Sequence, residues 1–81
     1  MTSEEAQRFL GACIAEITRA TVASSCQAFY RKSLALIQDM AECGLIDGQD
    51  GERLRLAAAQ AHVHWALHEA QAASERAAPM Q

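Results

Sequence analysis

At 81 residues the chain is long enough for one small domain, and such a domain buries only about 60% of the surface of its unfolded chain. Hydrophobic residues make up 51% of the sequence, but many are alanines that bury little area, which favours stabilisation by a second copy or another partner. The formal net charge of −3 argues against a protein built to bind nucleic acid.

The first predicted helix spans residues 3–23. Thr2 and Glu5 have the spacing of a capping box, in which each side chain binds the backbone N–H of the other residue. An apolar stripe follows at helical spacing, and it consists of Ala6, Leu10, Cys13, Ile14, Ile17 and Thr21. We expect Ile14 and Ile17 to anchor the core.

The second predicted helix spans residues 25–43, and its apolar stripe includes Phe29 and Tyr30 as core anchors. One long helix is an alternative, because no proline or glycine separates this segment from the first helix. At about 100° per residue, however, Cys26 would lie about 160° round the rod from Leu10, so the apolar face would change sides. We therefore predict a turn at residues 23–26, where Ser24 and Gln27 have capping-box spacing.

A stretch rich in glycine and aspartate precedes the third predicted helix. Gly44 is placed to end the second helix, and Asp50 is placed to cap a third helix at residues 51–77. The sequence thus predicts an all-α fold, a small three-helix bundle of residues 1–78 that combines a helical hairpin with a longer C-terminal helix. Residues 79–81 are expected to be a frayed C-terminus.

The third predicted helix has two apolar faces. One face should pack on the other helices, with Trp65 as a core anchor, and it consists of Leu54, Ala58, Ala61, Trp65 and Ala72. The second face lies about 200° away and consists of Leu56, Val63, Leu67 and Ala70. The second face would be covered within one chain if the other helices flanked this helix on opposite sides. We favour a protein interface instead, and we expect a homodimer.

All three histidines lie within residues 62–68. His64 and His68 are four residues apart, which is a spacing that two zinc ligands on one helix can have. The sequence identifies no further ligands, and it lacks the glutamate that follows the first histidine in the metalloprotease motif. We therefore predict no metal site, keep His64 and His68 as weak candidates, and place the histidines at the edge of the core or of an interface.

The three cysteines, Cys13, Cys26 and Cys43, are odd in number and widely spaced, which is typical of reduced thiols in a cytosolic protein. Cys26 lies within an apolar stripe, where a reactive thiolate is disfavoured. Because no other catalytic pattern and no phosphate-binding loop is present, we predict that the chain is not an enzyme and needs no cofactor.

The sequence therefore predicts a protein-interaction module, a regulator or inhibitor that docks on a larger protein assembly. Phages and plasmids often encode small proteins of this type, for example against host defence, and this comparison is an analogy of type alone. We expect a cytoplasmic protein, because no apolar stretch approaches the ~20 residues of a membrane span and no signal-peptide pattern follows Met1.

Two alternative functions remain. The first is a nucleic-acid-associated transcriptional or nucleoid regulator, which would gather Arg31, Lys32, Arg53 and Arg55 on one face of a dimer. The second is a metal-binding or redox protein that uses the histidines and cysteines.

Overall fold

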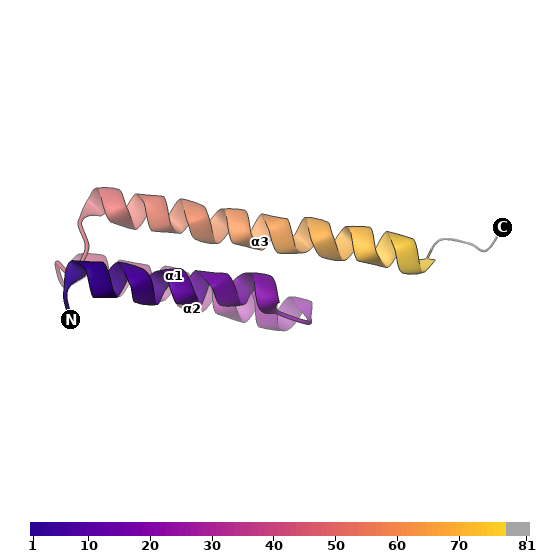
Figure 1. The fold of residues 1–81 in the computed structure, drawn as a ribbon, viewed down its shortest axis with the longest axis horizontal. Coiled ribbons are helices and arrows are strands. Elements are labelled where there is room, and N and C mark those ends of the chain that lie inside the picture. Colours follow the sequence, from indigo (N-terminus) through magenta and orange to yellow (C-terminus); the bar gives the residue numbers. More distant parts are fainter. Residues whose placement is uncertain (78–81) are drawn as a thin grey trace.

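The computed structural model describes residues 1–77 and shows three packed helices (Figure 1). The helices are α1 (Ser3–Arg19), α2 (Ala23–Glu42) and α3 (Gly48–Ala77). α1 and α2 form an antiparallel hairpin, and α3 lies along both and runs in the direction of α1. The all-α three-helix bundle is thereby confirmed. The frayed C-terminus predicted at residues 79–81, together with residue 78, lies outside the described residues.

α1 begins with the predicted capping box. The Thr2 hydroxyl accepts a hydrogen bond from the Glu5 backbone N–H at 3.1 Å, and the Glu5 carboxylate accepts one from the Thr2 backbone N–H at 2.9 Å. These bonds satisfy donors that a helix leaves unpaired at its first turn. The hydrogen bond from the Thr2 backbone lowers the pKa of the Glu5 carboxyl, and the bond to the Thr2 side chain adds to this effect.

The turn between α1 and α2 lies earlier than predicted. α1 ends at Arg19, Ala20 and Val22 have extended backbones, and α2 begins at Ala23 without a side-chain cap. The predicted turn at residues 23–26 and the capping box of Ser24 and Gln27 are therefore wrong, as is the alternative of one long helix. A distant contact helps to set the actual turn, because the Trp65 indole Nε1–H donates to the Ala20 carbonyl at 2.7 Å.

The connection from α2 to α3 confirms one predicted helix end and corrects another. Gly44 follows α2 with a φ of +78°, in the left-handed region that favours glycine at this position. α3, however, begins at Gly48 rather than at residue 51, and the Asp47 carboxylate accepts the Asp50 backbone N–H at 2.7 Å. Asp47 rather than Asp50 is therefore the capping residue, because helix caps accept from the residue three positions later.

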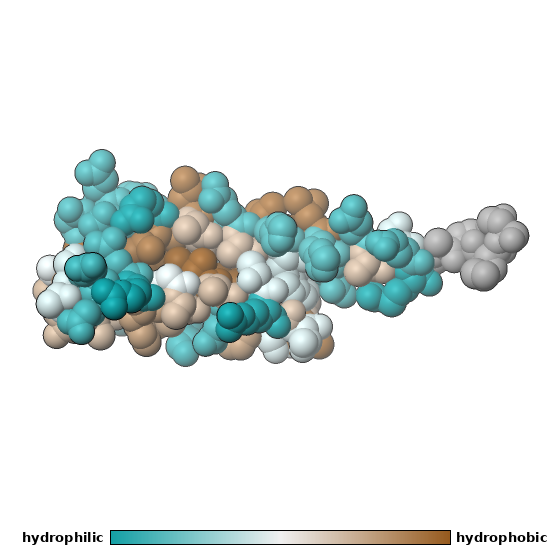
Figure 2. Space-filling model, viewed as in Figure 1, coloured by the Kyte–Doolittle hydropathy of each residue, from teal (hydrophilic) through white to brown (hydrophobic). Residues whose placement is uncertain are grey.

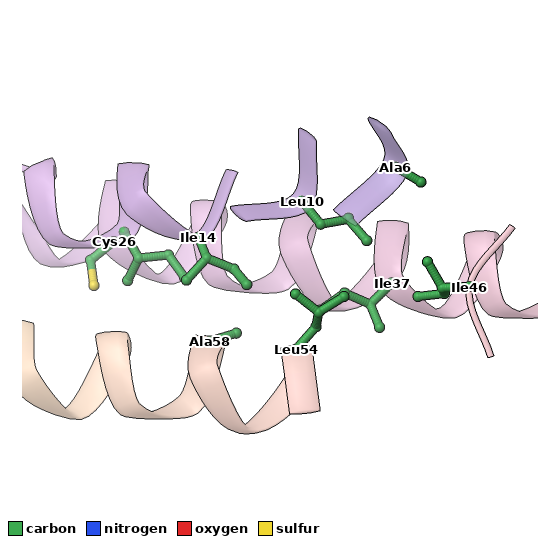
Figure 3. Close-up of a cluster of buried hydrophobic side chains, with 9 residues drawn as sticks. Ala6, Leu10, Ile14, Cys26, Ile37, Ile46, Leu54 and Ala58 are labelled. Carbon is green, nitrogen blue, oxygen red and sulfur yellow. The ribbon is translucent and has the colours of Figure 1, made fainter. Parts of the chain in front are cut away.

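The core is a narrow seam where the three helices meet (Figure 3). Each helix contributes residues at helical spacing: Ala6, Leu10, Ile14 and Ile17 from α1, Cys26 and Ile37 from α2, and Leu54 and Ala58 from α3. Ile46, from the connection, closes one end. The one buried polar side chain in the described part, Ser33, donates its hydroxyl to the Phe29 carbonyl at 2.9 Å. The seam therefore buries no unpaired polar group among residues 1–77.

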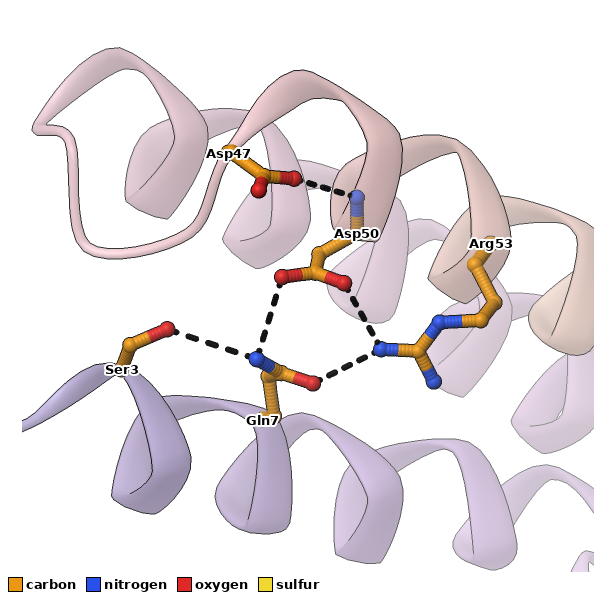
Figure 4. Close-up of polar contacts among 5 residues, drawn as sticks. All are labelled: Ser3, Gln7, Asp47, Asp50 and Arg53. Atoms are coloured by element: carbon orange, nitrogen blue, oxygen red, sulfur yellow. Dashed lines mark hydrogen bonds and ion pairs between the residues drawn. The ribbon is translucent and has the colours of Figure 1, made fainter.

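A polar network joins the first turns of α1 and α3 (Figure 4). The Gln7 side-chain amide donates to the Asp50 carboxylate at 3.2 Å and to the Ser3 hydroxyl at 3.3 Å. Arg53 donates to the Gln7 side-chain oxygen at 2.7 Å and to the Asp50 carboxylate at 3.0 Å. The network and the Trp65–Ala20 hydrogen bond thus connect α1 to α3 near both ends of α1.

Candidate protein-interaction surface

α3 carries large aliphatic side chains that the fold leaves uncovered. Leu56 is 58% exposed, Val63 is 55% exposed and Leu67 is 66% exposed. These three residues and the exposed Ala70 lie close together in helical phase, and we call them the outer face of α3. Figure 2 shows hydrophobic atoms along the edge of α3 that is turned away from α1 and α2.

The opposite side of α3 packs on the other two helices. Leu54 and Ala58 are buried, and Ala61 and Trp65 are partly buried against the core. A rotation of about 100° per residue places Leu56 about 200° from Leu54, so these faces point in nearly opposite directions. The alternative in which the other two helices flank α3 on opposite sides is therefore wrong, because that arrangement would cover the outer face.

Polar side chains border the outer face where α3 approaches its neighbours. Arg53 reaches Gln7 of α1, whereas Arg55 donates to Gln38 of α2 at 3.3 Å and pairs with Glu52 at 3.0 Å. The two arginines consequently lie on opposite flanks of α3. Such an apolar centre with a polar rim is typical of protein interfaces.

α3 extends past the end of the bundle (Figure 1). Trp65 is the last residue of α3 that packs against the core. Residues 66–77, which we call the overhang, continue the helix for about 18 Å. Within the overhang, Arg76 pairs with Glu69 at 3.2 Å. Leu67 and Ala70 of the outer face lie on the overhang, whereas Leu56 and Val63 lie on the supported part of α3.

The predicted core anchors occupy two environments. Ile14 and Ile17 are buried, with 9% and 0% of their surface exposed. Phe29, Tyr30 and Trp65 are partly buried and pack against the edge of the core. The aromatic anchors therefore cover the seam, and the branched aliphatic residues of α1 fill it.

The histidines separate into one packed ring and one exposed pair. The His62 ring lies against the Tyr30 ring of α2, with centroids 4.7 Å apart. His64 and His68 are exposed, and their nearly parallel rings have centroids 6.5 Å apart. No group of three or more possible metal-ligating side chains occurs in residues 1–77.

The three cysteines are unpaired thiols in different surroundings. Cys26 is buried in the core, and burial raises the pKa of its thiol by disfavouring the thiolate. Cys13 is half-buried and Cys43 is exposed. The buried position of Cys26 suits a packing role, because a thiolate nucleophile requires a lowered pKa.

The basic residues of the nucleic-acid alternative do not form one cluster within the chain. Arg31 and Lys32 are exposed on α2. Arg53 and Arg55 are on α3, where intramolecular partners hold them on opposite flanks. Within one copy, Arg53 and Arg55 therefore do not share the continuous basic face that binding to phosphates favours, and the alternative, which gathers the four residues across a dimer, stays a prediction.

Comparisons with family models, with curated proteins and with solved structures found no match to this chain. In the part of the chain that the structure describes, no pocket was found, and no helix combines the length and apolar character of a bilayer-spanning segment.

No pattern in the sequence predicted the polar network of Gln7, Asp50 and Arg53. Gln7 lies 43 residues from Asp50 and 46 residues from Arg53 along the chain, so no local spacing links it to them. The outer face, in contrast, has a clear signal, because the helical phase of four apolar residues is read directly from their spacing.

Proposed function

We propose that this protein is a non-enzymatic interaction module, a regulator or inhibitor that docks on a larger protein assembly through the outer face of α3. The observation that supports the proposal is the exposure of Leu56, Val63 and Leu67 on one side of a helix whose other side packs in the bundle. Large apolar side chains that are aligned and remain exposed after folding are typical of interaction sites.

The three exposed aliphatic side chains would supply part of the free energy of association. Burying a large aliphatic side chain completely contributes about 1.5–3 kcal/mol, and slightly more than half of each of these three remains exposed. Covering them would contribute roughly 3–5 kcal/mol before the entropic cost of association. Additional contacts from alanines and from the rim would make up the remainder of a moderate affinity.

The chemistry of the face indicates the kind of surface that it fits. Its large residues form one stripe along the helix axis, and the small side chain of Ala70 allows a partner backbone to approach closely. An apolar helix, or a groove lined by apolar helices, matches such a stripe. We therefore propose a helical apolar surface on the partner.

A non-enzymatic role is supported by the surroundings of the buried thiol of Cys26. Cys26 lies inside the core with a raised thiol pKa, and its position between packed aliphatic residues assigns it to stability. The protein would therefore act by occupying a surface of its partner.

The experiment is affinity capture from lysate of the native host with three forms of the protein. The wild type is compared with Leu56→Asp/Leu67→Asp and with the control Ala12→Asp/Ala35→Asp, which adds the same charge at exposed positions of α1 and α2. We expect wild type and control to retain the same larger protein and the α3 variant to lose it, with similar helical content by circular dichroism. Retention of that protein by the α3 variant would contradict the proposal.

A further inference from the structure

We infer that the outer face of α3 is covered, in the free protein, by α3 of a second copy that runs antiparallel to the first. The inference rests on the proposed function, because it names one occupant of the same surface. It follows from the order of large and small residues along α3, from the charges beside them and from the length of the face.

Apolar residues on the outer side of α3 recur at alternating steps of three and four. The series is Leu56, Ala59, Val63, Ala66, Ala70 and Ala73, and Leu67 lies beside it. Alternating steps of this kind define the seam along which two helices pack as a coiled coil. All these residues are exposed except Ala59, which is half-buried.

The large residues favour an antiparallel pair centred on Val63. In that register, Leu56 of one copy lies opposite Ala70 of the other, Leu67 lies opposite Ala59, and the two Val63 residues meet at the symmetry axis. Each leucine thus fills the space above an alanine, as close packing requires. A parallel pair would place leucine opposite leucine and alanine opposite alanine, so tight contacts would alternate with gaps along the contact between the two α3 helices.

The charges on the flanks favour the same direction. Arg53 and Arg55 flank the first half of the outer face, and Glu75 and Glu69 lie at matching helical phases beside the second half. An antiparallel pair brings Arg53 near Glu75 of the second copy, and Arg55 near Glu69. A parallel pair would bring arginines together. Such exposed pairs select orientation more than they add affinity. Arg53, Arg55 and Glu69 already have intramolecular partners, which they would share with the second copy.

The length of the helix segment that would pair limits the strength of the dimer. The segment from Arg53 to Glu75 is about 33 Å long, and a helix is about 10 Å wide, so each copy contributes a contact footprint on the order of 330 Å². Two such footprints fall below the roughly 1,000 Å² that a stable specific interface buries. The dimer should therefore be weak and should form in a concentration-dependent way.

Disulfide cross-linking tests the direction of the pair. In a background with Cys13→Ser and Cys43→Ser, which keeps the buried Cys26, single cysteines are introduced on α3. Val63→Cys should form a covalent dimer on mild oxidation, because this position meets its copy at the symmetry axis.

The decisive comparison uses two positions away from that axis. Leu56→Cys alone and Ala70→Cys alone should remain monomeric, whereas an equal mixture of the two should form a covalent heterodimer. A Leu56→Cys protein that cross-links to itself as fast as it does to Ala70→Cys would overturn the antiparallel arrangement.

Light scattering over a concentration series tests the pair without introduced cysteines. The wild-type mass should rise from 8.8 kDa towards twice that value, and Leu56→Asp/Leu67→Asp should weaken association by at least about 100-fold. A wild type that stays at 8.8 kDa up to millimolar concentration would overturn the inference. The proposed function would survive that result if the same variant still lost its larger partner in the capture experiment, and would fall with it if the partner were retained.

Discussion

Trp65 provides the sharpest test of how α3 is held on the bundle. Complete removal of a buried tryptophan side chain costs about 3–5 kcal/mol, and Trp65 is only partly buried, so the packing loss in Trp65→Ala should be about 2 kcal/mol. The hydrogen bond to the Ala20 carbonyl adds about 1 kcal/mol. Trp65→Phe keeps most of the packing and loses the hydrogen bond, so it should cost about 1 kcal/mol.

Thermal unfolding followed by circular dichroism measures both effects. For a domain of this size 1 kcal/mol corresponds to about 4–8 °C, so Tm should fall by about 12–24 °C for Trp65→Ala and by about 4–8 °C for Trp65→Phe. Gln71→Ala, at an exposed position of the overhang, is the control and should change stability by less than about 0.5 kcal/mol. A decrease of only a few degrees for Trp65→Ala would refute the argument that this ring holds α3 on the α1–α2 turn.

Two further predictions concern local conformation. Gly44→Ala should destabilise the fold by about 1 kcal/mol because of the positive φ at Gly44. Gly11 is an exposed residue of α1 with open space where an alanine Cβ would lie, so Gly11→Ala should stabilise the fold by about 0.5–1 kcal/mol. Urea unfolding of both variants checks this, and changes of the same sign would contradict it. The lowered pKa of Glu5 means that its capping contribution is complete above its ordinary value of 4.5 and is lost as the pH falls through the folded-state pKa. An NMR titration should place the Glu5 midpoint below 4.5 and move it back towards 4.5 in Thr2→Ala; an unchanged midpoint would exclude a role of the Thr2 side chain.

The sequence predicted those features that depend on a few neighbouring residues. The capping box of Thr2 and Glu5, the end of α2 at Gly44 and the apolar stripe with Ile14 and Ile17 all follow from local spacing. The same kind of pattern misplaced the cap of α3, because Asp47 and Asp50 are equally suitable residues three positions apart.

Local sequence patterns did not predict the features that depend on contacts between distant residues. The α1–α2 turn lies where Trp65 binds the Ala20 carbonyl, a contact across 45 residues, so the spacing of Ser24 and Gln27 did not determine it. The outer face was predictable as a line of apolar residues because helical phase alone defines it. Which molecule covers the outer face depends on the surface of that molecule, so the identity of the partner stays a prediction.

Trp65 is the single tryptophan of the chain, so its intrinsic fluorescence reports on one place in the fold. The indole lies at the boundary between the supported part of α3 and the overhang, with its Nε1–H on the α1–α2 turn. Its fluorescence should respond when the three helices separate and should be insensitive to unwinding confined to the far end of α3. Melting curves from fluorescence and from circular dichroism would consequently distinguish opening of the bundle from loss of the terminal helical turns.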